Sequence, residues 1–214
     1  MEDTICAVST APGAGGIAVI RISGPEAIAI CNTIFVPRTA GKGLLSQKAY
    51  TLRYGSIRRG EELIDEVLIA LFRAPHSFTG EDTVEITCHG SVYIQQQIMQ
   101  LLIERGCRSA LPGEYTQRAF MNGKMDLSQA EAVADLIAST SAGQHRLALS
   151  QMRGGFSREL AELRNQLLHF TSLMELELDF SDHEELEFAD RSELRTLADH
   201  IEQVISKLAQ LRFT

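Results

Sequence analysis

The stretch that decides the fold reads SFTGEDTVEITCHGS from Ser77 to Ser91. A glycine turn leads into seven residues of alternating polarity, which predict a strand over 83–89. The polar positions share one face of that strand and are Thr83, Glu85, Thr87 and His89. The apolar positions share the other face and are Val84, Ile86 and Cys88. A mid-strand glutamate is uncommon because its charge resists burial, so Glu85 needs solvent, a cation or a donor-rich ligand opposite it. A solvated sheet face is the plainest interpretation.

Short β-branched runs and helical patterns alternate around this stretch. We expect strands over 4–8, 17–22, 50–58 and 63–72, with the last two forming a hairpin. The loop Pro12–Gly16 is followed by a β-branched run and not by a helix, which argues against a dinucleotide-binding loop. A capping box from Ser23 to Glu26 predicts a helix through about residue 32, and Ser91 is expected to cap a second helix that ends near Gly106.

Strand signals stop near residue 115. Ser128 and Glu131 form another capping-box pattern, which predicts a helix whose inner stripe is Val133, Ala134, Ile137 and Ala138. Heptad-like apolar spacing over 156–174 and 194–211 indicates long helices that pack as an ordinary bundle. The expected class is therefore α+β, with a mixed α/β domain over residues 1–118 and a helical-bundle segment over 119–214.

The composition limits the functions that the chain can have. Its 214 residues are 44% hydrophobic and 22% charged with a net charge of -8, which suits a globular protein and argues against a broad basic surface for nucleic acid, although it leaves a local patch open. Four widely spaced cysteines without a CxxC pair indicate neither zinc nor disulfides and fit a cytoplasmic protein. The acidic run from Glu175 to Asp190 lacks calcium-loop spacing, so we expect no metal site. No signal peptide or membrane span is expected.

Several long ordered motifs resemble one known family. They are APGAGGIAVIRISG over 11–24, SFTGED over 77–82, PGEYTQRAFMNGKMDL over 112–127 and QAEAVADLI over 129–137. These motifs are similar to the N-terminal region of the MnmE (TrmE) family of tRNA modification GTPases, and the similarity spans almost the whole chain.

The resemblance implies a fold and a function. The family has a tetrahydrofolate-binding domain related to the aminomethyltransferases, then a helical domain into which a GTPase domain is inserted. It forms homodimers through the N-terminal domain. With an FAD-dependent partner protein, it forms carboxymethylaminomethyl or aminomethyl groups at carbon 5 of the tRNA wobble uridine, using a tetrahydrofolate one-carbon unit.

The chain departs from the full family pattern. It has no GxxxxGK[ST] phosphate loop, so the GTPase domain with its GTP, Mg and K is missing and GTP hydrolysis is not expected. The family's C-terminal Cys-x-Gly-Lys motif is missing too, and Leu211–Thr214 breaks off a helical pattern without a cap. We expect the chain to be a fragment.

The resemblance places 5-formyl-tetrahydrofolate, or a related tetrahydrofolate, at Arg21, Glu85 and Lys124. A carboxylate such as Glu85 can accept adjacent pterin N–H groups, and the fork of Arg21 can meet a formyl oxygen or a folate carboxylate. Without the resemblance, an ion pair would be the preferred interpretation of Arg21, and a turn lysine such as Lys124 is normally only solvated. No residue of this chain is assigned a catalytic role.

Other residues of the motifs have plainer interpretations. His89 shares the face of Glu85, but a lone histidine at a strand end is more often a hydrogen-bonded structural residue. Thr79 and Gly80 are expected to shape the turn, and Glu114 and Arg118, four residues apart, to form a salt bridge. Two other functions stay open: a free-standing folate-dependent aminomethyltransferase, and a scaffold with a vestigial folate site.

Overall fold

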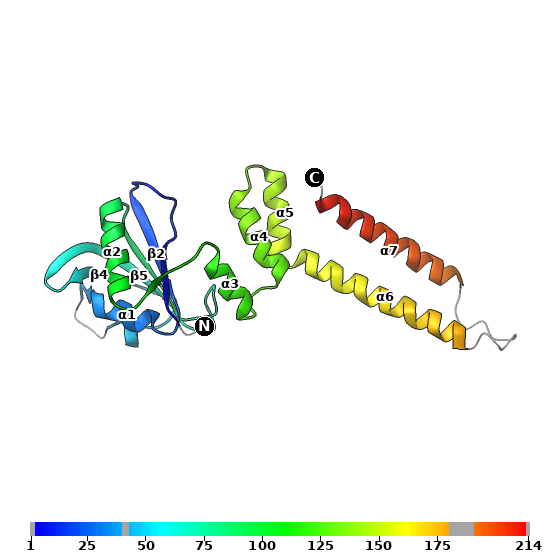
Figure 1. Cartoon of the computed structure of the whole chain (residues 1–214), viewed down its shortest axis with the longest axis horizontal. Helices are drawn as coiled ribbons and strands as arrows, with labels where there is room; N and C mark the ends of the chain where they lie inside the picture. The colour runs from blue at the N-terminus through cyan, green and yellow to red at the C-terminus, as the bar shows by residue number, and fades with distance from the viewer. Residues whose placement is uncertain (1–2, 40–42, 180–190, 213–214) are drawn as a thin grey trace. The chain divides into compact units, whose positions relative to one another are not determined.

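A computed structural model of the chain describes residues 3–39, 43–179 and 191–212. The chain divides into two compact units, Met1–Ala130 and Glu131–Thr214 (Figure 1). The first unit combines a β-sheet with helices, whereas the described part of the second unit is helical. The predicted α+β class is therefore confirmed.

The first unit is built on a seven-stranded sheet in the order β3-β4-β5-β6-β2-β1-β7. The strands are β1 (Ile5–Val8), β2 (Ile17–Ser23), β3 (Phe35–Pro37), β4 (Thr51–Arg59), β5 (Glu62–Phe72), β6 (Thr83–His89) and β7 (Arg108–Ser109). Neighbouring strands are antiparallel except β1 and β7, which are parallel. The expected hairpin is formed by β4 and β5, and β6 lies at the centre of the sheet between β5 and β2.

Helices α1 (Ala27–Ile34) and α2 (Val92–Glu104) supply the apolar side chains that bury one face of this sheet (Figure 1). A short 3-10 helix, η1 (Leu44–Ser46), lies beside α1. Val84 and Ile86 of β6 are fully buried in this core, and Cys88 is 3% exposed. Burial raises the pKa of the Cys88 thiol to about 11. The alternation predicted for β6 is thus confirmed, with the polar positions turned to the opposite face.

The expected cap of α1 is wrong. The N-cap residue is Glu26 and makes no side-chain cap bond, while Ser23 lies at the end of β2 and donates to Glu81 at 2.8 Å. Its hydroxyl is fully buried beneath the loop that precedes β6, so it bonds to that loop and cannot reach the helix. Ser91 does occupy the N-cap position of α2, but its side chain makes no cap bond.

Helix α3 (Glu114–Met121) completes the first unit, and α4 (Leu127–Ala138) leads into the second. The capping box of α4 lies two residues earlier than expected, because Asp126 and Gln129 each accept the other's backbone N–H at 2.9 Å. The expected inner stripe of α4 is also wrong at Ala134, Ile137 and Ala138, which are all exposed, with Ile137 at 81%, whereas Val133 is half-buried and Ala132 is buried. The helix therefore turns the side of Ala132 inward.

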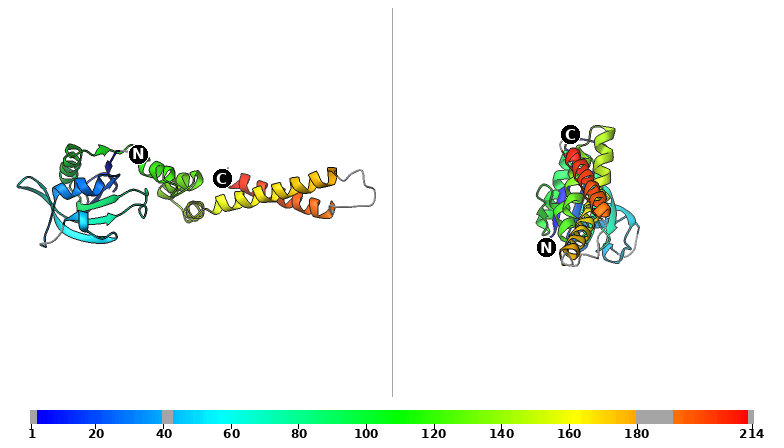
Figure 2. Two further views of the ribbon diagram at one scale, coloured as in Figure 1. Left: turned by 90° about the horizontal axis from the view of Figure 1, so that it is seen from below. Right: turned by 90° about the vertical axis from the view of Figure 1, so that its right-hand side faces the viewer.

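The second unit continues with α5 (Ala142–Met152), α6 (Gly155–Asp179) and α7 (Arg191–Arg212). Helices α6 and α7 run side by side in opposite directions (Figure 2). Two of the predicted seam residues, Leu163 and Ile201, are buried, but Leu160 and Leu167 are 42% and 44% exposed. Most of the acidic run considered for calcium, residues 180–190, lies outside the described residues.

Candidate functional site

Arg21 and Glu85 lie directly opposite each other on β2 and β6, on the sheet face that α1 and α2 leave open. The Nε and one terminal nitrogen of Arg21 donate to the same carboxylate oxygen, Oε1 of Glu85, at 2.9 and 2.6 Å. The ion pair that we considered for Arg21 is therefore formed, and its partner is the other predicted site residue. The strand register brings the two residues together although they are 64 positions apart.

This pairing leaves half of the carboxylate available. Among the described residues, Oε2 of Glu85 has no hydrogen-bond partner, and the side chains of Arg21 and Glu85 are 29% and 25% exposed. A carboxylate oxygen accepts more than one hydrogen bond. Glu85 can therefore accept a hydrogen bond from a donor in solution through Oε2, while the ion pair with Arg21 neutralises the charge of Glu85.

Two aromatic rings flank the guanidinium of Arg21. Its central carbon lies 5.7 Å from the ring centre of Phe78 and 5.8 Å from that of Tyr115, distances typical of cation–π contacts. The Tyr115 hydroxyl donates to the backbone oxygen of Arg21 at 2.6 Å, and burial raises the pKa of this hydroxyl. Phe78 is 39% exposed, so solutes can reach part of this apolar side chain.

The side chain of Lys124 contacts the loop of residues 73–82, which also carries Phe78. Its Nζ donates to the backbone oxygen of Pro75 at 2.9 Å, and Asn122 donates to that of Thr79 at 2.7 Å. Gly80 has a φ of 79°, and a Cβ there would lie 3.2 Å from Cγ of Lys124, so this glycine both makes the turn and admits the lysine stem. No described hydrogen bond joins Lys124 to Arg21 or Glu85. The ligand roles of all three residues stay predictions.

A buried ion network fixes the loop and α3 beneath this cluster. The fully buried Arg118 donates to Glu81 at 3.2 Å, to Glu114 at 3.1 Å and to Asp3 at 2.7 Å. The predicted bridge between Glu114 and Arg118 is therefore confirmed, but it lies in the interior and not on the surface. Hydrogen bonding from Arg108, together with that from Arg118, lowers the pKa of Glu114 to about 2.

His89 is a hydrogen-bonded structural residue, as we expected for a lone histidine at the end of a strand. Its Nδ1 lies 2.7 Å from Oδ1 of the buried Asp65, and its backbone N–H donates to Oδ2 of the same carboxylate at 2.8 Å. Asp65 comes from the neighbouring strand β5, so the pair ties the ends of two strands together.

Sequence reasoning missed Phe78, Tyr115 and Glu81 as parts of the site. All three lie within the quoted motifs, but no periodicity marks them, because they come from a loop and from the first turn of a helix. Their meeting with Arg21 and Ser23 depends on how the loop folds over the sheet.

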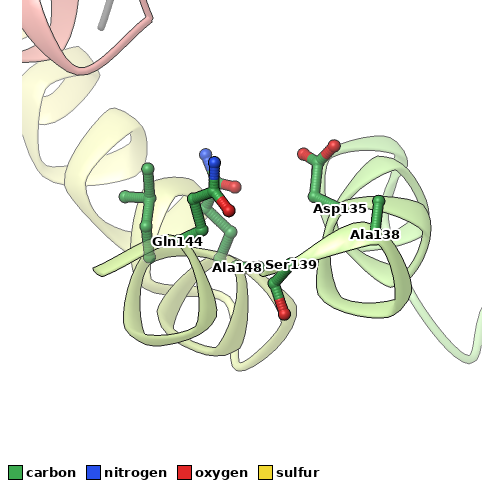
Figure 3. A pocket seen from close by; sticks show the side chains of 7 residues that line it. Asp135, Ala138, Ser139, Gln144 and Ala148 are labelled. Carbon is green, nitrogen blue, oxygen red and sulfur yellow. The ribbon is translucent and has the colours of Figure 1, made fainter. Parts of the chain in front are cut away.

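The second unit contains a hollow of about 210 Å³ between α4 and α5. Asp135 and Ala138 face it from α4, Gln144 and Ala148 from α5, and Ser139 from the connection between them (Figure 3). A hollow of this size holds a few waters or a small side chain. Its lining has one carboxylate and no basic side chain, so it is a weaker candidate than the Arg21–Glu85 cluster.

No group of three or more His, Cys, Asp or Glu side chains in the described ranges is placed to hold a metal ion. None of the helices in the described part of the chain is long and apolar enough to cross a membrane.

Comparisons with known proteins agree with the motifs. Residues 4–124 match the family model described as GTP-binding protein TrmE N-terminus, and residues 127–212 match the MnmE helical domain. Relatives named tRNA modification GTPase MnmE include those of Parabacteroides distasonis, 85% identical over 208 residues, and Bacteroides thetaiotaomicron, 72% identical over 207 residues. The matched regions cover 97% of this chain but only 45% and 44% of those relatives, so the chain spans less than half of their length.

Proposed function

The chain belongs to the TrmE N-terminus family and carries residues of the MnmE helical domain, and from this membership we propose that it is the folate-binding and dimerising region of a GTP-dependent tRNA modification enzyme. The substrate of its first unit is a tetrahydrofolate that carries a one-carbon unit, with 5-formyl-tetrahydrofolate as the first candidate. Bound there, the folate supplies that carbon.

The observation that carries this proposal is the half-satisfied carboxylate of Glu85. A pterin edge presents adjacent N–H groups, and Oε2 of Glu85 is an acceptor for them that no described group occupies. The exposed ring of Phe78 offers a surface on which a flat heterocycle can stack. Arg21 and Lys124 add positive charge for the oxygens of the formyl group or of the folate tail.

Replacing Glu85 by glutamine tests the site. The change keeps the shape of the side chain but removes a charged acceptor, and losing such a hydrogen bond typically costs about 1 to 3 kcal/mol, or roughly five- to 150-fold in affinity. We expect isothermal titration with 5-formyl-tetrahydrofolate to show a loss in this range while circular dichroism stays unchanged.

Glu66→Gln is the matched control. Glu66 lies on the neighbouring strand β5 and accepts hydrogen bonds from Arg38 and Tyr54 away from the cluster, so its replacement should leave folate binding intact. Unchanged binding by the Glu85→Gln variant, or an equal loss in both variants, would rule out Glu85 as the pterin anchor.

The remaining parts of the proposal concern the longer protein. With GTP, Mg and K bound in a GTPase domain and with an FAD-dependent partner, the enzyme forms the aminomethyl-type group at the wobble uridine of tRNA in the cytoplasm. The family description and the names of the relatives support GTP binding and tRNA modification, and the other parts of this proposal rest on the resemblance of the motifs.

Self-association is supported by apolar side chains on the open sheet face. Leu52 and Tyr54 of β4 are 70% and 43% exposed, and Leu68, directly opposite Tyr54 on β5, is 41% exposed. Contiguous apolar side chains of this kind mark interaction surfaces. We assign the β4–β5 part of this face to a homodimer formed through the first unit, and the β2–β6 part, with Arg21 and Glu85, to the ligand.

A further inference from the structure

Three arginines gather where α5 meets α6, and we name Arg146, Arg153 and Arg158 the α5–α6 arginine cluster. All three side chains are exposed. Residues 136–158 contain these three arginines and His145 but no Asp or Glu, in a chain whose net charge is -8. The local charge is therefore opposite in sign to that of the whole chain.

The helix geometry places the arginines of α5 on the side of this helix that faces away from α4. Arg146 and Arg153 are seven residues apart, or about two helical turns and roughly 10 Å, so they project from the same side. The residues that line the hollow toward α4 include Gln144, Ala148 and Gln151, which occupy the opposite side of α5. The arginine side is consequently free of the α4 packing.

The third arginine is held beside the second. A terminal nitrogen of Arg158 donates to the backbone oxygen of Arg153 at 2.9 Å, which is a favourable position for a cation at the C-terminal end of a helix. That bond uses one of the donor groups of the Arg158 guanidinium. Within the described ranges, no hydrogen bond or ion pair joins Arg146 or the guanidinium of Arg153 to an acidic group.

The basic residues of the first unit behave differently. Residues 27–60 also lack Asp and Glu, yet Arg38 there pairs with Glu66 and Arg59 pairs with Glu104. Two arginines of this acid-free run are thus paired with acidic side chains of neighbouring elements. The α5–α6 arginine cluster keeps its charge for a ligand.

We propose that the α5–α6 arginine cluster binds the phosphate backbone of RNA. The guanidinium fork matches phosphate oxygens, and two arginines about 10 Å apart reach phosphates of different nucleotides. Ser150 and His145 beside the cluster are exposed and polar, which suits phosphate and sugar contacts better than a protein interface, where buried aromatic anchors dominate. The inference rests on the proposed function, because tRNA modification gives the chain an RNA partner.

The test uses the 214-residue chain and a fluorescently labelled, unmodified tRNA transcript with uridine at the wobble position. Binding is followed by fluorescence anisotropy between about 50 and 200 mM salt, where phosphate contacts are released in proportion to their number. The double variant Arg146→Gln, Arg153→Gln should bind roughly five- to thirtyfold more weakly at the low-salt end. Its plot of log affinity against log salt should be shallower by about 2.

The double variant Arg105→Gln, Arg195→Gln is the matched control. Both residues are exposed and lie outside the cluster, and their replacement removes the same formal charge as the first double variant does. This control should keep the affinity and the salt dependence of the parent chain. An equal loss in both variants, or a parent chain whose RNA binding does not depend on salt, would overturn the proposal. If the first double variant misfolds, Arg158→Gln alone should still lower the slope by about 1, and an unchanged slope there would overturn it as well.

Two further measurements separate the possible outcomes. The first is competition with polyglutamate. If polyglutamate displaced the labelled tRNA as effectively as unlabelled tRNA does, the cluster would be assigned to an acidic protein partner and the proposal would be overturned. Titration with 5-formyl-tetrahydrofolate should give the same affinity for the Arg146→Gln, Arg153→Gln variant as for the parent. Lost RNA binding with intact folate binding therefore supports the cluster, whereas absent folate binding in the parent would count only against the proposed function.

Discussion

Arg118 is the residue on which the surroundings of the site depend most. It is fully buried and joins α3 to the N-terminal segment and to the loop before β6, through Glu114, Asp3 and Glu81. Among the described residues, its replacement leaves the largely buried Glu81 without an ionic partner, whereas Glu114 and Asp3 keep Arg108, and breaking a buried ion pair typically costs about 3 to 5 kcal/mol. We expect Arg118→Met to lower the free energy of unfolding in urea by an amount of this order.

Arg38→Met is the control for that measurement. Arg38 also bonds to a glutamate, Glu66, but the two side chains are 70% and 46% exposed, and exposed pairs contribute about 0 to 1 kcal/mol. A loss for Arg118→Met no larger than that for Arg38→Met would show that the buried network does not hold the loop.

The same network predicts how stability depends on pH. Hydrogen bonding holds the pKa of Glu114 at about 2, below the usual 4.5, so its contribution is fully present above about pH 4.5 and is lost as the pH falls toward 2. Hydrogen bonding from Arg108 lowers the pKa of Asp3 in the same direction. Unfolding followed by circular dichroism should show stability falling across this window, with Glu114 contributing on the order of 1 to 2 kcal/mol.

Glu114→Gln isolates the glutamate. Because glutamine does not titrate, the variant should lose stability less steeply between pH 4.5 and pH 2 than the parent chain does, with Asp3 contributing to the slope that remains. Identical pH profiles for the two proteins would show that the native state does not depend on the ionised form of Glu114.

At the scale of elements, periodicity predicted β1, β2, β4, β5 and β6 but neither the short strands β3 and β7 nor the loop contacts. The alternation along β6 correctly gave its two faces, because a period of two survives wherever one face is buried. The cap expected at Ser23 failed because its hydroxyl found buried partners 56 and 58 residues away, at Thr79 and Glu81. Contacts of that range leave no local signal, and this also explains why Phe78 and Tyr115 were missed beside Arg21.

The junction between the glycine loop and β6 gives a test at this scale. Gly90 follows β6 and packs so closely on Gly15 that a Cβ there would lie 2.6 Å from the carbonyl carbon of Gly15. Two backbone hydrogen bonds, from Gly15 to Gly90 and from Gly90 to Gly16, hold the segments together. We expect Gly90→Ala to force them apart and to lower the free energy of unfolding by about 1 to 3 kcal/mol.

Gly16→Ala is the matched substitution in the same loop. A Cβ at Gly16 would meet nothing within 4 Å, so this variant should differ from the parent by less than about 0.5 kcal/mol. If thermal or urea unfolding gave the two alanine variants the same stability, close backbone approach would not be the reason for glycine at position 90.

At the scale of the whole molecule, the candidate ligand sites are divided between the two units. Arg21, Phe78, Glu85, Tyr115 and Lys124 all belong to Met1–Ala130, whereas the α5–α6 arginine cluster belongs to Glu131–Thr214. The sequence separated a strand-containing part from a helical part because the period of the hydrophobic pattern changes along the chain. Which surfaces remain free on each part could not be read from it, since exposure depends on the tertiary packing that left Ile137 outside and Arg118 inside.

This division predicts that residues 1–130 suffice for folate binding. Their core is drawn from β-strands, α1, α2, η1 and Cys107, all within residues 1–130, and the ion network of Arg118 closes within the same unit, so the fragment has the buried surface to fold by itself. We expect the fragment to unfold cooperatively and to bind 5-formyl-tetrahydrofolate within about threefold of the affinity of the 214-residue chain, a difference below about 0.7 kcal/mol. Calorimetry on both proteins, with the Glu85→Gln fragment as the control, makes the comparison. A folded fragment that binds more than about tenfold more weakly would mean that residues beyond 130 contribute to the folate site, and the site would then have to be sought across both units.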